Sequence, residues 1–125
     1  MIIKNGTLFC EGGSFRTMDL KIQNGHIAEI GSQLAADGQE SLDATNCYVV
    51  PGLVDIHIHG AVGADFSDGE GASIQTMARF LLSQGVTSFL GTSMALPGER
   101  LSQIYRTARP FVGQAVPGMA TLRGV

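Results

Sequence analysis

The sequence has no tryptophan, and it has only two cysteines, four prolines and three histidines among 125 residues. Charged residues make up only 15% of the chain, and lysine and arginine occur singly, so no basic stripe is available for nucleic acid or an anionic membrane surface. No apolar run approaches the about 18 residues of a membrane-spanning helix, and polar residues interrupt the N-terminus too early for a signal peptide. We therefore expect a cytoplasmic protein without nucleic-acid or membrane partners.

The composition is that of a folded globular chain. Hydrophobic residues make up 44%, and the 17 glycines lie at turn positions, which predicts many short elements. Cys10 and Cys47 share no metal-type spacing and lie in apolar, strand-like segments. They are predicted to be free, buried thiols rather than a disulfide.

Residues 1–50 are predicted to form a small all-β unit. Asn24-Gly25 separates two strand-like segments and provides the positive φ angles of a tight hairpin turn, so His26 is expected to be an exposed hairpin residue. The pattern changes at Pro51-Gly52. We take residues 51–125 as a second region.

The second region has a β-α-β-α-β order. The expected strands are 53–59, 86–92 and 119–125, and the expected helices are 73–84, stopped by Gly85, and 97–109. The second helix carries an apolar stripe of Leu101, Ile104, Tyr105 and Ala108. The starts of these strands are equally spaced along the chain, at a distance close to the about 31 residues per β/α unit of a TIM barrel. Periodicity alone also allows a doubly wound sheet.

Three such strands are fewer than the eight that close a barrel. We therefore expect the chain to be the front part of a longer polypeptide. An open strand edge and uncovered helix faces would also favour association with another chain.

The most informative segment is "PGLVDIHIHG", Pro51 to Gly60, because it places two of the three histidines one residue apart at a strand end. Strict alternation predicts Asp55, His57 and His59 on one face, and Val54, Ile56 and Ile58 on the other. Imidazoles are good ligands for zinc and related ions, and two of them on one strand face can reach a single ion. Ordinary solvated or hydrogen-bonded histidines are the alternative interpretation.

At these residues the sequence resembles the amidohydrolase superfamily, whose first barrel strand ends in His-x-His. More narrowly, "PGLVDIHIHGAVGADFSDG" together with "GVTSFLGTS" resembles the N-acetylglucosamine-6-phosphate deacetylases. The shorter pattern around the two histidines also fits dihydroorotases, allantoinases and D-aminoacylases. The resemblance implies an α/β fold in which a small β-sandwich precedes an amidohydrolase (β/α)8 barrel, with residues 1–50 as part of the sandwich.

The resemblance implies metal-dependent hydrolysis of N-acetylglucosamine 6-phosphate to glucosamine 6-phosphate and acetate, a step of amino-sugar catabolism. His57 and His59 would be metal ligands, with zinc the first choice and iron, manganese, cobalt or nickel as alternatives. The catalytic aspartate, an H-x-E-G-P segment and two further ligand histidines are expected beyond Val125. The 125 residues alone are therefore predicted to be inactive, and the longer protein is expected to be a homodimer.

Other residues near the histidines receive secondary roles. Asp55 is expected either to orient a histidine or to make a structural hydrogen bond at the strand end. Gly60 and Gly63 are expected to let the chain turn, or to offer backbone N–H groups to an anion. Asp65, together with Asp68, is expected to fix this loop. Thr92 follows the second strand and is expected to approach the substrate.

Two other interpretations stay open at this point. One is a different amidohydrolase, of the dihydroorotase, allantoinase or D-aminoacylase kind. The other is a non-catalytic module that folds with a partner.

Overall fold

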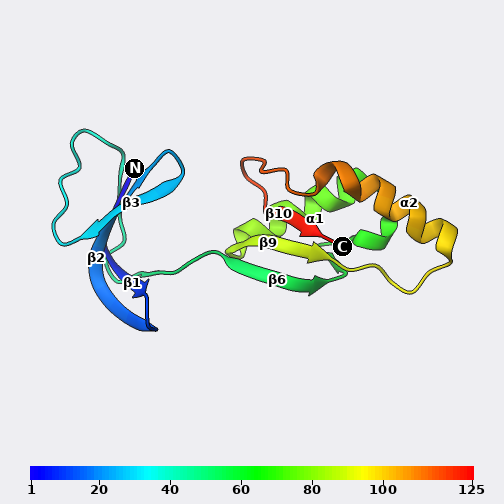
Figure 1. Cartoon of the computed structure of the whole chain (residues 1–125), viewed down its shortest axis with the longest axis horizontal. Coiled ribbons are helices and arrows are strands. Elements are labelled where there is room, and N and C mark those ends of the chain that lie inside the picture. The colour runs from blue at the N-terminus through cyan, green and yellow to red at the C-terminus, as the bar shows by residue number, and fades with distance from the viewer. The chain divides into compact units, whose positions relative to one another are not determined.

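A computed structural model describes residues 1–125 and divides them into two compact units, Met1–Pro51 and Gly52–Val125 (Figure 1). The boundary lies within the Pro51-Gly52 pair, where the sequence pattern changes. No helix in the chain is long and apolar enough to cross a membrane.

The first unit is one five-stranded sheet. Its strands are β1 (Ile2–Cys10), β2 (Ser14–Gln23), β3 (His26–Gly31), β4 (Ser41–Asp43) and β5 (Tyr48–Val49). The order is β3-β2-β1-β4, and β5 also pairs with β1. Asn24 and Gly25 have φ angles of 52° and 76° between β2 and β3, which confirms the predicted hairpin, and His26 is exposed.

A buried carboxylate holds the first strand where its ladder is irregular. The pairing of β1 with β2 shifts between Ile3 and Gly6, and the Asn5 N–H released there donates to Asp19 Oδ1 at 2.8 Å. Asp19 Oδ2 also accepts from the Leu34 N–H and lies 2.8 Å from Lys4 Nζ. The Lys4 ammonium and these two backbone N–H groups hold the pKa of Asp19 below its usual value.

The cysteines differ in part from expectation. Both thiols are free, as predicted. The prediction that both are buried is wrong, because Cys47 is exposed in the turn before β5 and Cys10 is half-buried at the end of β1. Cys10 is the last residue of β1 and Cys47 lies just before β5, so both are at segment ends, where cover by the rest of the chain is not revealed by local apolar composition.

The second unit has the predicted β-α-β-α-β order. Three parallel strands, β6 (Leu53–Ile58), β9 (Val86–Gly91) and β10 (Thr121–Gly124), pair in the order β10-β9-β6. The helices are α1 (Gly71–Ser83) and α2 (Gly98–Ala108). Short elements are the hairpin β7 (Gly60–Ala61) and β8 (Ala64–Asp65), and the 3₁₀ turns η1 (Phe66–Asp68) and η2 (Arg109–Phe111).

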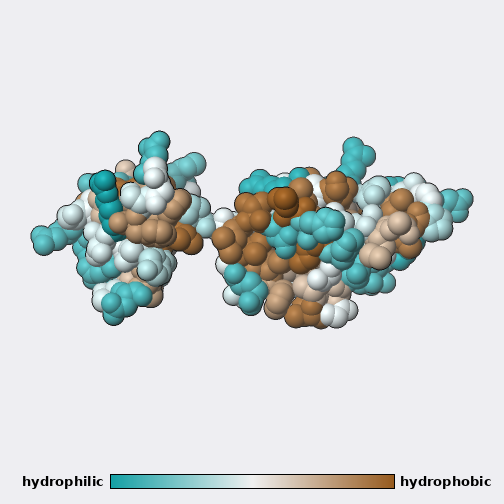
Figure 2. Space-filling view, turned by 90° about the horizontal axis from the view of Figure 1, so that it is seen from below, coloured by the Kyte–Doolittle hydropathy of each residue, from teal (hydrophilic) through white to brown (hydrophobic).

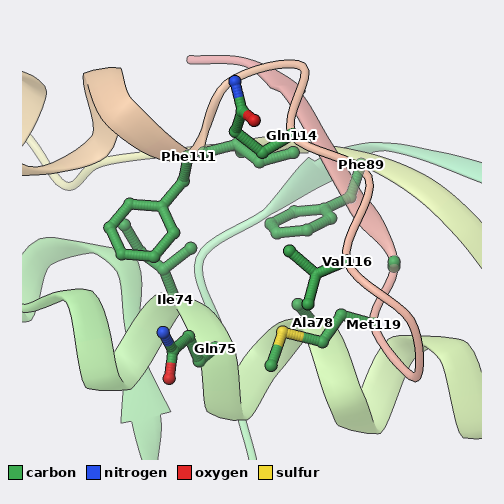
Figure 3. Close-up of a pocket in the computed structure, with 10 residues that line it drawn as sticks. Ile74, Gln75, Ala78, Phe89, Phe111, Gln114, Val116 and Met119 are labelled. Atoms are coloured by element: carbon green, nitrogen blue, oxygen red, sulfur yellow. The ribbon is translucent and has the colours of Figure 1, made fainter.

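The helices cover one side of this sheet. Ile74, Met77 and Leu81 of α1 are buried in one cluster with Phe89 of β9 and Leu122 of β10. Figure 3 shows side chains of α1, such as Ile74 and Ala78, facing Val116 and Met119 of the segment that leads into β10. The gap between them holds about 30 Å³, little more than a water molecule occupies, so we assign no ligand to it.

The edge strand β6 leaves apolar side chains uncovered. Leu53, Val54 and Ile56 are 56%, 62% and 73% exposed, and Figure 2 shows apolar surface over this unit. Helix α2 is expected to bury an apolar stripe that includes Ile104, Tyr105 and Ala108. Ile104 and Ala108 are buried, as expected. The prediction is wrong for Tyr105, which is 42% exposed and bonds Ser93 through its hydroxyl group.

Candidate metal centre

The site lies where the parallel strands of the second unit end. Because β6, β9 and β10 run parallel, their carboxyl ends meet at one edge of the sheet. The Thr92 N–H, directly after β9, donates to the Ile58 carbonyl oxygen at 2.9 Å. The segments that follow β6 and β9 therefore lie side by side, in the position where open α/β sheets bind ligands.

Strand β6 contains an irregularity that decides which way its side chains point. Its pairing with β9 passes from Asp55 opposite Phe89 to Ile58 opposite Gly91, so β6 has one residue more than its partner there. Ile58 accordingly packs against the apolar core, while Ile56 is exposed. The prediction of strict alternation, with Ile56 and Ile58 on one face, is wrong because of this bulge.

The bulge also separates Asp55 from the two imidazoles. Asp55 Oδ1 accepts a hydrogen bond from the His57 backbone N–H at 3.0 Å. Of the two roles expected for Asp55, the structure shows the hydrogen bond at the strand end and no contact with an imidazole nitrogen. This bond satisfies an N–H group that the disrupted ladder leaves free.

The two imidazoles converge. His57 Nε2 and His59 Nε2 are 3.2 Å apart, and the ring planes stand at 79° to one another. Two nitrogens bound to one tetrahedral zinc ion at about 2.0–2.1 Å would lie about 3.3 Å apart. The spacing of the two Nε2 atoms therefore fits a shared metal ion, and without a metal it also fits one hydrogen bond.

The other nitrogen of His59 is unsatisfied. Nδ1 is buried and has no hydrogen-bond partner. A histidine that binds a metal through one ring nitrogen usually donates the N–H of the other to an oxygen, and these 125 residues place no such oxygen at His59 Nδ1. Two imidazoles with their Nε2 atoms 3.2 Å apart form a donor set that fits a divalent transition-metal ion.

The chain provides only two candidate ligands at this point. No third histidine, cysteine, aspartate or glutamate joins His57 and His59. A catalytic zinc site usually has three protein ligands and an open position. The two histidines alone therefore fall short of the ligand set of such a site.

The loop after the histidines is rigidly held. The Asp65 backbone N–H donates to Asp68 Oδ2 at 2.9 Å, and Asp65 Oδ1 accepts from the Ser67 N–H at 2.7 Å. The Ser73 hydroxyl at the start of α1 donates to the same Asp68 oxygen. The Asp65 N–H, the Ser73 hydroxyl and the nearby Arg100 cation together hold the pKa of Asp68 below its usual value.

Two glycines of this loop are required for different reasons. A Cβ at Gly60 would lie 2.5 Å from the Ala64 carbonyl oxygen, so only glycine fits in the β7–β8 hairpin. Val62 and Gly63 form its tip with φ angles of 49° and 82°. The left-handed region suits Gly63, but it is unusual for a β-branched residue such as Val62.

Sequence reasoning missed residues that position the site. Phe66 is 1% exposed beneath the loop, and its N–H donates to the His59 carbonyl oxygen at 2.7 Å. A Cβ on Gly91 would lie 2.4 Å from the Phe66 ring. The glycine at the end of a β-strand was the available signal, because such a glycine often marks a close approach.

No family model matches the chain. An N-acetylglucosamine-6-phosphate deacetylase of Lysinibacillus sphaericus is 32% identical over 94 residues, which cover 75% of this chain and 24% of the relative. A D-hydantoinase of Geobacillus stearothermophilus is 48% identical over 58 residues, 46% of this chain and 12% of the relative. The crystal structure of the N-acetylglucosamine-6-phosphate deacetylase from Thermotoga maritima superposes with a TM-score of 0.69 at 32% identity, covering 89% of this chain and 28% of that one.

The fold and the His-x-His strand are therefore those of a mixed α/β chain that is similar to amidohydrolases. Among these relatives, the matches confirm the resemblance to the N-acetylglucosamine-6-phosphate deacetylases: the sequence match to the Lysinibacillus sphaericus enzyme covers 75% of the chain, against 46% for the Geobacillus stearothermophilus D-hydantoinase. The chain spans about a quarter of the length of the deacetylases that it matches.

Proposed function

We propose that this chain contributes the first part of the active site of a metal-dependent deacetylase. The reaction is hydrolysis of N-acetylglucosamine 6-phosphate to glucosamine 6-phosphate and acetate. In this proposal residues 1–50 belong to a small β-sandwich, and residues 51–125 are the first β/α units of an amidohydrolase barrel. The match covers about a quarter of the relative's length, which supports the view that this chain contributes only part of the active site.

The observation that carries the proposal is the 3.2 Å separation of His57 Nε2 and His59 Nε2 at the carboxyl edge of a parallel sheet. In the proposal these two nitrogens hold a divalent ion, with zinc preferred and iron, manganese, cobalt or nickel acceptable. When bound, such an ion polarises an amide carbonyl and lowers the pKa of a water molecule.

The chain's other residues keep this half-site in place. Asp55 fixes the backbone of the bulge next to the two imidazoles, through its bond to the His57 N–H. Asp65 and Asp68 fix the loop that starts at Gly60, and Thr92 lies beside Ile58 at the edge where a substrate would enter. The acid that protonates the leaving amine, the remaining ligands and the phosphate contacts lie outside these residues in this proposal.

The test compares His57→Asn and His59→Asn with His26→Asn in the protein that carries this chain. His26 is the third histidine and is exposed in the β2–β3 hairpin, so its replacement is a matched control. Bound zinc per chain and zinc affinity are measured by elemental analysis and titration calorimetry. We expect each site variant to weaken zinc binding by at least about 100-fold, since even removal of an outer partner of a ligand costs 10–100-fold.

Activity is measured in parallel as acetate release from N-acetylglucosamine 6-phosphate. We expect wild type and His26→Asn to be active, both site variants to be impaired, and the 125-residue chain alone to release no acetate. Unchanged zinc binding in both site variants would contradict the metal site.

A second candidate is hydrolysis of a cyclic amide, which the match to the D-hydantoinase favours. Dihydroorotate and a simple hydantoin are therefore included in the same assay. Turnover of these compounds without acetate release would replace the deacetylase proposal. Absence of turnover with all three substrates would favour a non-catalytic module.

A further inference from the structure

A hollow of about 240 Å³ lies at the same edge of the sheet as the two histidines. Its lining includes Ile56 of β6, Leu90 of β9, and Thr92 and Ser93 directly after β9, with Tyr105 of α2. Ile56 directly precedes His57, and the Thr92 N–H is bonded to the carbonyl oxygen between the two histidines. The hollow therefore adjoins the strand segment that presents the imidazoles.

Three hydroxyl-bearing residues line this hollow, and two of them, Ser93 and Tyr105, are bonded to one another. Ser93 Oγ and the Tyr105 hydroxyl oxygen are 3.2 Å apart, so each fixes the direction of the other. The two groups have two protons between them, and their mutual hydrogen bond uses one. One donor and several lone pairs are left for a ligand. Tyr105 is 42% exposed, so a ligand can reach its hydroxyl group.

The lining indicates the kind of group that would bind. No charged side chain lines the hollow, so it lacks the arginine or lysine that typically binds a phosphate. Ile56 and Leu90 add apolar side chains to the lining. A neutral ring with hydroxyl groups at its rim and C–H groups on its face has the matching chemistry.

We propose that Ser93 and Tyr105 form a subsite for a ring hydroxyl group of the amino-sugar substrate. This inference rests on the proposed deacetylase function. The pair binds the sugar directly and sets specificity for it, while the acyl group and the phosphate lie elsewhere. Loss of either hydroxyl group should therefore weaken substrate binding and leave the chemical step nearly unchanged.

The experiment uses Tyr105→Phe and Ser93→Ala in the protein that carries this chain. Tyr48→Phe removes the only other tyrosine hydroxyl, which lies in the first unit, and Ser102→Ala removes an exposed hydroxyl from helix α2; both serve as matched controls. Values of kcat and KM are measured with N-acetylglucosamine 6-phosphate and with its 3-deoxy and 4-deoxy analogues.

With the natural substrate, we expect both site variants to raise KM by about 2–10-fold, the value of one hydrogen bond, with kcat within about twofold of wild type. For wild type, one of the two deoxy analogues should have a KM about 2–10-fold higher than that of the natural substrate. For Tyr105→Phe, the KM of the same analogue should equal that of the natural substrate. Such non-additivity identifies a direct contact, because a merely structural role of Tyr105 would leave the two losses additive.

The outcomes separate the two proposals. If wild type releases acetate but KM is unchanged in both site variants, the subsite alone is overturned. The same holds if the rises in KM caused by Tyr105→Phe and by each deoxy analogue are fully additive. A Tyr105→Phe variant that alters only the preference between N-acetyl and N-propionyl substrates also overturns it. No acetate release by wild type overturns the deacetylase function and the subsite with it.

Discussion

Replacing Gly91 with alanine should loosen the loop that follows the two histidines. The added Cβ would lie 2.4 Å from Phe66 Cε2, 2.5 Å from Cδ2 and 2.9 Å from Cζ. Ordinary carbon contacts are about 3.5–4.0 Å, so the ring would have to move by about 1 Å. Phe66 is 1% exposed and has little room to move, which places Gly91→Ala near the upper end of the about 1–3 kcal/mol cost of overpacking.

The displacement should reach His59 through a single hydrogen bond. The Phe66 N–H donates to the His59 carbonyl oxygen at 2.7 Å, so a shifted ring pulls on the residue that holds one imidazole. We expect faster amide hydrogen exchange at Phe66 and Ser67, together with a loss of about 2–3 kcal/mol in the free energy of unfolding. Urea unfolding and native-state hydrogen exchange measure the two quantities.

A control and a double variant make the reasoning refutable. Gly98→Ala is the control, because a Cβ there meets nothing within 4 Å and the backbone needs no positive φ. It should be neutral or stabilise by up to about 1 kcal/mol. Phe66→Leu shortens the side chain, so it should offset part of the cost of Gly91→Ala in a double-mutant cycle. Equal effects of Gly91→Ala and Gly98→Ala, or full additivity in the cycle, would refute the steric argument.

Two further predictions concern charge and backbone strain. Asp19→Asn should cost about 3 kcal/mol, at the low end for a broken buried ion pair because Lys4 keeps some contact with water. Since the folded-state pKa of Asp19 is below 3.8, its contribution is present above that pH and disappears as the pH falls through the lowered value. Acid unfolding followed by circular dichroism should thus be shallower in Asp19→Asn, and a parallel curve would contradict the assignment. Val62→Gly should stabilise the hairpin by up to about 1 kcal/mol, because a β-branched residue is strained at φ 49°, and a lower melting temperature would count against it.

Local signals were sufficient for most of the secondary structure. Asn24-Gly25 marked the β2–β3 hairpin, and Gly85, with φ 81°, marked the end of α1. These are short-range effects, because a left-handed residue or a helix stop depends on a few neighbouring residues. The His-x-His pattern likewise indicated the strand end and the pair of candidate ligands.

Side-chain direction was harder to predict. The bulge in β6 depends on pairing with β9, a strand about thirty residues away, and it reversed the expected facing of Ile56 relative to Ile58. Tyr105 fitted the helical stripe of α2, yet a bond to Ser93 keeps its hydroxyl group at the sheet edge. Both departures arise from contacts between segments that are distant in the sequence.

The sequence by itself determined the order of elements, the break at Pro51-Gly52 and the presence of two histidines at one strand end, because each depends on residues close together in the chain. Only the tertiary structure decided that His57 Nε2 and His59 Nε2 converge to 3.2 Å, that Asp55 bonds the backbone, and that Phe66 packs against Gly91. These features depend on strand register and close packing, where a shift of one residue or a single methyl group changes which atoms meet.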